Sequence, residues 1–75
     1  MIEWTEAQIG RLAQYVATVG NYDLSVTGDK SHWMWAIWQQ GRDRSEFRGI
    51  ERSAADAMRM AESVVRRVLD WSPEP

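Results

Sequence analysis

The stretch His32-Trp33-Met34-Trp35-Ala36-Ile37-Trp38-Gln39 decides how this chain is expected to fold. Successive side chains of a β-strand point to opposite faces of the sheet. Positions 33, 35 and 37 hold Trp, Trp and Ile, and positions 34, 36 and 38 hold Met, Ala and Trp. Both faces are therefore apolar, which indicates a central strand with a neighbour on each side. We expect this strand over residues 32–40.

The preceding residues predict the first neighbour, a strand over residues 21–27. Its apolar and polar side chains alternate, which is the period of a strand with one solvent-exposed face. Gly28-Asp29 follows, a dipeptide typical of a two-residue hairpin turn. A turn at this point would place Leu24 opposite Trp33 in the next strand.

A third strand is expected over residues 44–51, after a turn over residues 40–44. In the register that this turn favours, Gly49 lies opposite Trp35. An indole lying over a strand glycine is a favourable cross-strand arrangement. The residue types therefore support the register.

Two amphipathic helices are predicted, one before and one after the three strands. The first, over residues 5–19, has apolar residues at steps of three and four, and Gly20-Asn21 would end it. The second, over residues 53–70, begins at Ser53, with Asp56 placed to complete a capping box. The apolar positions of the first helix are Ile9, Leu12, Val16 and Val19.

Together these elements predict a single α+β domain over residues 1–75, with residues 71–75 as a tail. The element order is α-β-β-β-α, a three-stranded antiparallel meander with two helices packed on one face. The apolar sides of the helices and of the sheet would form one core. Its expected members are Trp33, Trp35, Ile37, Phe47, Leu24, Val16, Leu12, Ala61, Val64 and Val68.

The composition excludes several kinds of chemistry. The chain has 75 residues, no cysteine and one histidine, so it lacks the usual groups of disulfides, thiolate zinc sites and nucleophilic catalysis. We therefore expect no enzyme activity and no cofactor or metal. The net charge of −2 is too balanced for tight direct binding of nucleic acid. No apolar run is long enough to span a membrane, and the absence of cysteine fits a cytoplasmic location.

The outer face of the predicted sheet, the side away from the helices, is the first candidate partner-binding surface. Met34 and Trp38 lie on it, and Arg48 and Asp23 would rim it. Tryptophan and methionine beside arginine is the composition of a protein interface core. The alternatives are that arginine side chains and the C-terminal tail with Trp71 fold over this face, or that its aromatic side chains stack on single-stranded nucleic acid.

Arginines concentrate between residues 42 and 52, with acidic residues interleaved among them. This segment is interpreted either as a solvated, salt-bridged strand or as a docking patch for an acidic partner. Arg42 and Arg44 from this segment complete the candidate partner-binding set. At the other end, residues 1–29 carry one base against four acids, a net charge of −3, so the N-terminal third is expected to be an acidic surface.

The predicted element order, with Gly49-Ile50-Glu51-Arg52-Ser53-Ala54-Ala55-Asp56-Ala57 leading into the second helix, resembles the double-stranded RNA-binding domain. That family has a glycine, a capping serine and an alanine-rich helix in this region, with phosphate-binding lysines at the start of the helix. Here the positions of those lysines hold Ala54 and Ala55. The resemblance implies the α-β-β-β-α fold and makes nucleic-acid binding the alternative function, although the lysines that carry it are missing.

A second resemblance is to small phage and prophage proteins, many of which bind and block a host machine, anti-CRISPR proteins among them. It is carried by Trp33-Met34-Trp35-Ala36-Ile37, followed by Gly49, Ser53 and Ala57. The resemblance implies a phage- or prophage-encoded inhibitor, monomeric or homodimeric. Its partner would be a host protein or ribonucleoprotein complex, such as a CRISPR effector, in the host cytoplasm.

Overall fold

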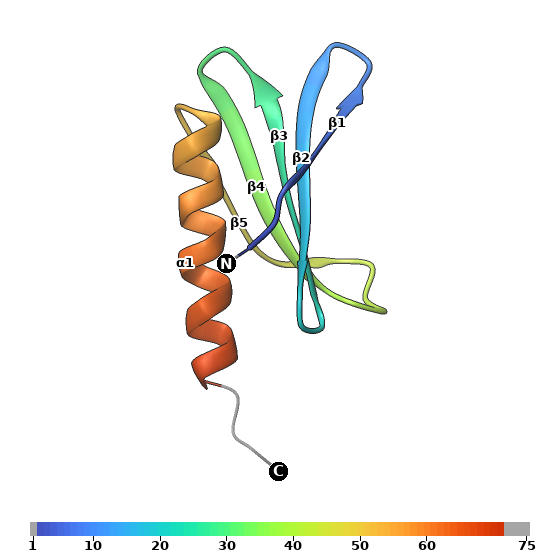
Figure 1. Cartoon of the computed structure of the whole chain (residues 1–75), viewed down its shortest axis with the longest axis vertical. Helices are drawn as coiled ribbons and strands as arrows, with labels where there is room; N and C mark the ends of the chain where they lie inside the picture. The colour runs from blue at the N-terminus through green and yellow to red at the C-terminus, as the bar shows by residue number, and fades with distance from the viewer. Residues whose placement is uncertain (1, 72–75) are drawn as a thin grey trace.

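A computed structural model, which describes residues 2–71, shows a five-stranded antiparallel sheet followed by one helix (Figure 1). Each strand pairs with the next one along the chain, so the spatial order is the sequence order. The elements are β1 (Thr5–Ile9), β2 (Leu12–Val19), β3 (Tyr22–Asp29), β4 (His32–Gln39), β5 (Ser45–Glu51) and α1 (Ala54–Trp71).

The first three connections of the sheet are two-residue turns that recur every ten residues. They lie at residues 10–11, 20–21 and 30–31, and the strands between them have eight residues each. Gly10, Gly20 and Lys30 have φ angles of 59°, 58° and 50°. Positive φ in such turns matches the right-handed twist of the flanking strands. The chain therefore folds back on itself at regular intervals.

The predicted helix over residues 5–19 is wrong, because this segment forms β1, a turn and β2. The left-handed backbone of Gly10 breaks the segment at a point where a helix would have to continue. Beyond the turn, Tyr15, Val16 and Thr18 are aromatic or β-branched, and such residues favour strands. The predicted α-β-β-β-α order with two helices on one face is therefore replaced by five strands and a single helix. The resemblance to the double-stranded RNA-binding domain loses the element order on which it rested.

The other predicted elements are confirmed, with one change of register. Gly49 lies opposite Trp35 between β4 and β5, as expected. Between β3 and β4, however, Leu24 lies opposite Ile37 and not opposite Trp33. The turn lies at residues 30–31, because β3 continues through Gly28-Asp29 instead of turning there.

The core lies between α1 and the face of β3, β4 and β5 that the helix covers. Ala57, Ala61 and Val65, spaced by four residues, form the buried stripe of α1. The small alanine side chains let the helix come close to the sheet, where Leu24, Val26, Trp35 and Ile37 are buried. The helix begins as predicted, with the amide of Asp56 donating to the hydroxyl of Ser53 over 3.1 Å.

The N-terminal segment joins this core from the side of the sheet formed by β1 and β2. Ile2 and Trp4 pack against the buried cluster. The indole Nε1 of Trp4 donates to a carboxylate oxygen of Glu62 on α1 over 2.7 Å. The start of β1 is therefore tied to the helix, and Figure 1 shows the segment that precedes β1 running towards α1.

The expected core is correct for most of its members and wrong for three. Leu12, Val16 and Phe47 are exposed. Leu12 and Val16 were assigned to a helix, but in β2 they lie on the face opposite α1. Phe47 does lie on the helix side, yet on the edge strand β5. The correct members are buried or partly buried, namely Trp33, Trp35, Ile37, Leu24, Ala61, Val64 and Val68.

The contact between Trp35 and Gly49 gives a test of the packing. A Cβ atom at Gly49 would lie 2.6 Å from the indole of Trp35, so Gly49→Ala should destabilise the fold by about 1–3 kcal/mol through overpacking. Trp35→Ala alone should cost about 3–5 kcal/mol. In the Trp35→Ala background, Gly49→Ala should add no further cost, because the clash is gone. Chemical denaturation of the four proteins measures these values.

The matched control for this cycle is Ile50→Ala, the next residue along β5, whose side chain is 69% exposed. It should change the free energy of unfolding by less than about 0.5 kcal/mol. An equal cost of Gly49→Ala in both backgrounds would contradict the packing of the indole over this glycine.

Candidate functional site

The face of the sheet opposite α1, which we call the outer face, carries most of the large apolar side chains that the core does not use. Residues opposite each other in an antiparallel register share a face, so each cross-strand row can be assigned to the helix side or to the outer side. The exposed apolar residues on the outer face are Ile9, Leu12, Val16, Met34 and Ile50. They come from four of the five strands.

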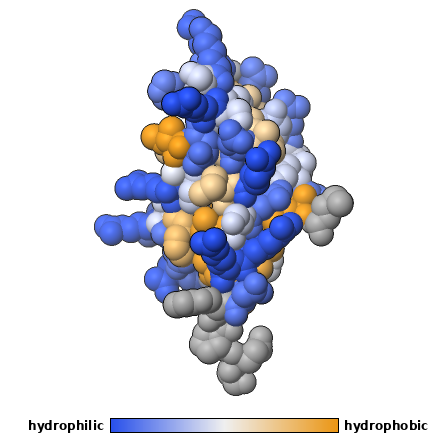
Figure 2. Space-filling model, turned by 90° about the vertical axis from the view of Figure 1, so that its left-hand side faces the viewer, coloured by the Kyte–Doolittle hydropathy of each residue, from blue (hydrophilic) through white to orange (hydrophobic). Residues whose placement is uncertain are grey.

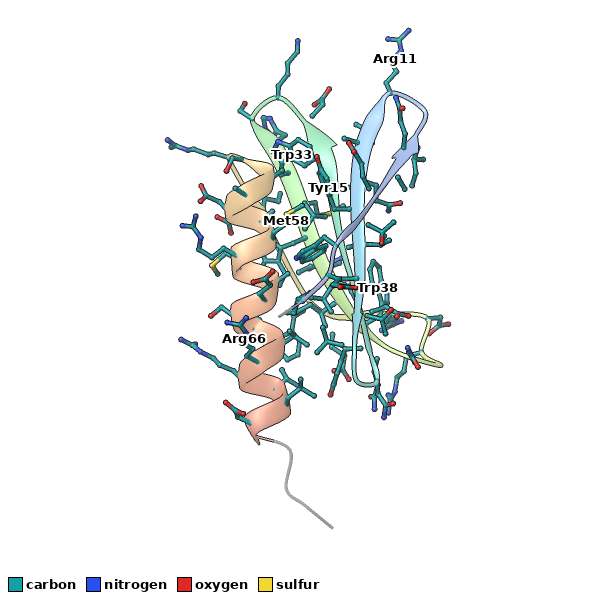
Figure 3. The ribbon with its side chains drawn as sticks, in the orientation of Figure 1. Arg11, Tyr15, Trp33, Trp38, Met58 and Arg66 are labelled. Carbon is teal, nitrogen blue, oxygen red and sulfur yellow. The ribbon has the colours of Figure 1, made fainter. Side chains whose placement is uncertain are left out.

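Four of the predicted partner-binding residues lie together on this face. Met34 is 51% exposed, and Trp38 is partly buried and projects to the side of the sheet away from α1 (Figure 3). Asp23 lies opposite Trp38 on β3, and Arg48 lies opposite Ala36 on β5. The four side chains thus surround Ala36, a small residue at the centre of the face.

The other two predicted residues lie apart from this group. Arg42 and Arg44 are exposed in the connection between β4 and β5, at the end of the sheet. The two ion pairs found among residues 2–71 are both within α1, Asp56 with Arg59 at 3.7 Å and Glu62 with Arg66 at 3.9 Å. The interpretation of residues 42–52 as a salt-bridged strand therefore has no ion pair in the described chain to support it.

A shallow hollow of about 530 Å³ lies on the outer face beside Trp38. Val16 and Ser25, which lie opposite each other on β2 and β3, are among its lining residues, and so are the acidic residues Glu3 and Asp23. The Asp23 carboxylate accepts hydrogen bonds from the hydroxyl of Thr18 over 3.2 Å and from the side-chain amide of Gln40 over 3.4 Å. Its position is therefore set by a group from β2 and by a group from the residue that follows β4.

Sequence reasoning missed the half of the outer face that β1 and β2 provide. Ile9, Leu12 and Val16 were assigned to a buried helix face because their spacing fits a helical period. The signal that could have corrected this is the pair Gly10 and Gly20, ten residues apart, which marks two turns of a meander.

The helix side of the molecule has a different character. Met58 points from α1 towards the sheet, where the rings of Tyr15 and Trp33 lie with centroids 6.2 Å apart (Figure 3). The solvent side of α1 is mostly hydrophilic, with separate apolar spots (Figure 2). Met60 is one exposed apolar residue of this helix. The outer face of the sheet is thus the more extensive apolar surface among the described residues.

The sequence also allowed the hypothesis that the C-terminal tail folds over the outer face. The tail residues 72–75 and the side chain of Trp71 lie outside the described part of the chain. Within the described residues, no group of three or more His, Cys, Asp and Glu side chains is placed to hold a metal ion. His32 is exposed at the start of β4, opposite Asp29. The single helix α1 is not apolar enough to cross a membrane.

Comparison with known proteins gave no match to a protein family, to a curated protein or to a solved structure.

The charges of the outer face and of the first turn of α1 predict that the protein does not bind duplex RNA tightly. The hollow on the outer face is lined by the carboxylates of Glu3 and Asp23. The first turn of α1 holds Asp56 and no basic residue. A gel shift with an RNA duplex of about 20 base pairs at physiological salt should show no submicromolar complex. Submicromolar binding that weakens steeply with added salt would contradict this expectation.

Proposed function

We propose that the protein is a non-catalytic binding module that docks the outer face of its sheet on another protein. The observation that carries this proposal is the gathering of five exposed large apolar residues on one face of the sheet. The five residues form two groups, Ile9, Leu12 and Val16 on β1 and β2, and Met34 and Ile50 on β4 and β5. Polar side chains of β3, Ser25 and Thr27 among them, lie between the two groups. Exposed apolar side chains gathered on one face and bordered by polar groups are typical of an interaction surface.

The chemistry of the face supports a protein partner. Met34 and Trp38 are residue types enriched in the centres of protein interfaces. Small and hydroxyl-bearing residues such as Ser25 and Ala36 lie between them on the same face, so a partner side chain could approach the backbone there. The charged groups Asp23 and Arg48 lie beside this centre, where they would orient a partner rather than supply most of the affinity.

The proposed role is that of a phage- or prophage-encoded inhibitor, which occupies a surface of a host protein or ribonucleoprotein complex in the host cytoplasm. Its support is the Trp33-Met34-Trp35-Ala36-Ile37 strand with Gly49, Ser53 and Ala57, the pattern shared with small phage proteins. A protein with this role needs a complementary surface and no reactive group.

The test begins with affinity purification of a tagged copy from its host and identification of the captured protein by mass spectrometry. Binding of that protein is then measured for Met34→Glu. A charge at the centre of the docking surface should weaken binding at least tenfold, which corresponds to about 1.4 kcal/mol. Met34 is the better test position than Trp38, because it is 51% exposed and its substitution removes little packing.

Met60→Glu is the matched control, since this methionine is 41% exposed on α1. It should leave binding within about twofold of the unchanged protein, and both variants should keep the wild-type circular dichroism spectrum. If Met60→Glu abolishes binding and Met34→Glu does not, the helix surface and not the outer face is the docking site.

A further inference from the structure

The two edges of the sheet are protected to different degrees. Edge strands expose unpaired backbone amides and carbonyls, which proteins commonly shield with charges, bulges or proline. The edge strand β5 contains Glu46, Arg48 and Glu51 and is irregular where it pairs with residues 37–38 of β4. The other edge strand, β1, has the sequence TEAQI, pairs with β2 without irregularity, and has all five residues exposed. Its one charged side chain is Glu6.

We propose that β1 pairs antiparallel with β1 of a second copy, about a two-fold axis at Ala7, so that the two sheets join edge to edge. Opposed residues of antiparallel strands share a face, whereas successive residues of one strand point to opposite faces. A two-fold axis between two residues would oppose side chains of different faces, so a symmetric pairing of identical strands must centre on a residue. Centring on Ala7 is the choice that pairs all five residues of β1. It also places Glu6 opposite Gln8 of the second copy, twice in each dimer.

Carboxylate and amide side chains in that position can hydrogen-bond across the strands. Centring the pair on Glu6 would instead oppose two carboxylates, which is unfavourable. The strand is thus complementary to itself in one register. This is why the proposed occupant of the edge is a second copy of this chain.

The outer face gives a second, independent argument for this register. Ile9 lies opposite Leu12, and Thr5 lies opposite Val16, in the pairing of β1 with β2. Pairing about Ala7 puts Ile9 opposite Thr5 of the second copy. Two such rows, related by the two-fold axis, then run across four strands. Each row contains Leu12 and Ile9 of one copy, followed by Thr5 and Val16 of the other copy. Three apolar residues that are exposed in the single chain, Ile9, Leu12 and Val16, become members of continuous rows.

The pairing lies in the plane of the sheet, so it does not compete with docking on the outer face. It also leaves α1 of each copy on the same side of the joined sheet. The inference therefore goes beyond the proposed function and does not depend on it.

Because the chain has no cysteine, one introduced thiol reports on one position. In Ala7→Cys, the two thiols of the dimer lie on opposed residues. Opposed Cα atoms of antiparallel strands are about 4.5–5.5 Å apart, within the range of about 4.4–6.8 Å that disulfides span. Mild oxidation followed by non-reducing electrophoresis should convert most of Ala7→Cys to a covalent dimer.

Ile50→Cys is the matched control, because residue 50 lies on the same cross-strand row of the outer face at the opposite edge. It should remain monomeric under the same oxidation. Equal crosslinking of the two variants, crosslinking of Ile50→Cys alone, or crosslinking of neither overturns the proposal.

A pair of charge variants tests the register without a covalent trap. Gln8→Lys would face Glu6 of the second copy and should strengthen association, whereas Gln8→Glu should weaken it. Each dimer contains two such contacts, so we expect a change of about two- to thirtyfold in the dimerisation constant in each direction, as measured by sedimentation. A change of the same sign for both variants, or no change for either, overturns the Glu6–Gln8 register.

Discussion

The buried indole of Trp35 is the constraint on which the rest of the fold depends. It lies across Gly49 of the neighbouring strand, donates its Nε1 hydrogen to Glu51 over 3.3 Å, and is 6% exposed. A side chain at position 49 would occupy the space of the ring. The alanines of α1 face the same cluster, so sheet and helix both leave room for this one large side chain.

This constraint also determines which side chains lie on the outer face. Once Trp35 and Gly49 are opposed on the helix side, strand alternation places Met34, Ala36 and Arg48 on the other side. The core and the candidate surface are therefore two consequences of the same register. One helix can cover only one face of the sheet, and α1 covers it over β3, β4 and β5. The hydrogen bond from Trp4 to Glu62 ties the start of β1 to that layer.

Sequence patterns were sufficient for β3, β4, β5 and α1. Alternation or apolar content indicated the three strands, and a helical period with the capping residue Ser53 indicated the helix. Such patterns were insufficient for residues 5–19, where Ile9, Leu12 and Val16 recur at steps that fit a helix. A short run of apolar residues at three- and four-residue steps can also arise from two strands joined by a turn. The glycines at positions 10 and 20 distinguish the two cases, because their left-handed backbone forms the hairpin turns.

The error in the β3–β4 register has a different cause. Gly28-Asp29 has the composition of a tight turn, but the chain turns at Lys30, whose φ is 50°. Lysine is not one of the residue types that indicate a positive φ in a hairpin turn. Gly28 instead lies buried in the strand, where a Cβ atom would meet the backbone of His32 and Trp33. The turn is displaced by two residues, an even number. The predicted faces of Met34 and Trp38 were therefore right although their predicted partners across the strand were wrong.

The distribution of apolar side chains separates what stabilises the fold from what the fold displays. Leu24, Val26, Ile37 and Val65 are fully buried, and their burial supplies much of the hydrophobic stabilisation. Ile50, which is 69% exposed on an edge strand, gains little from folding and adds a risk of aggregation. The same holds for Ile9 at the other edge, which is 54% exposed. Stability alone gives no reason for apolar residues at these positions, whereas contact with a second protein surface does, and this reasoning supports both the docking face and the pairing of β1.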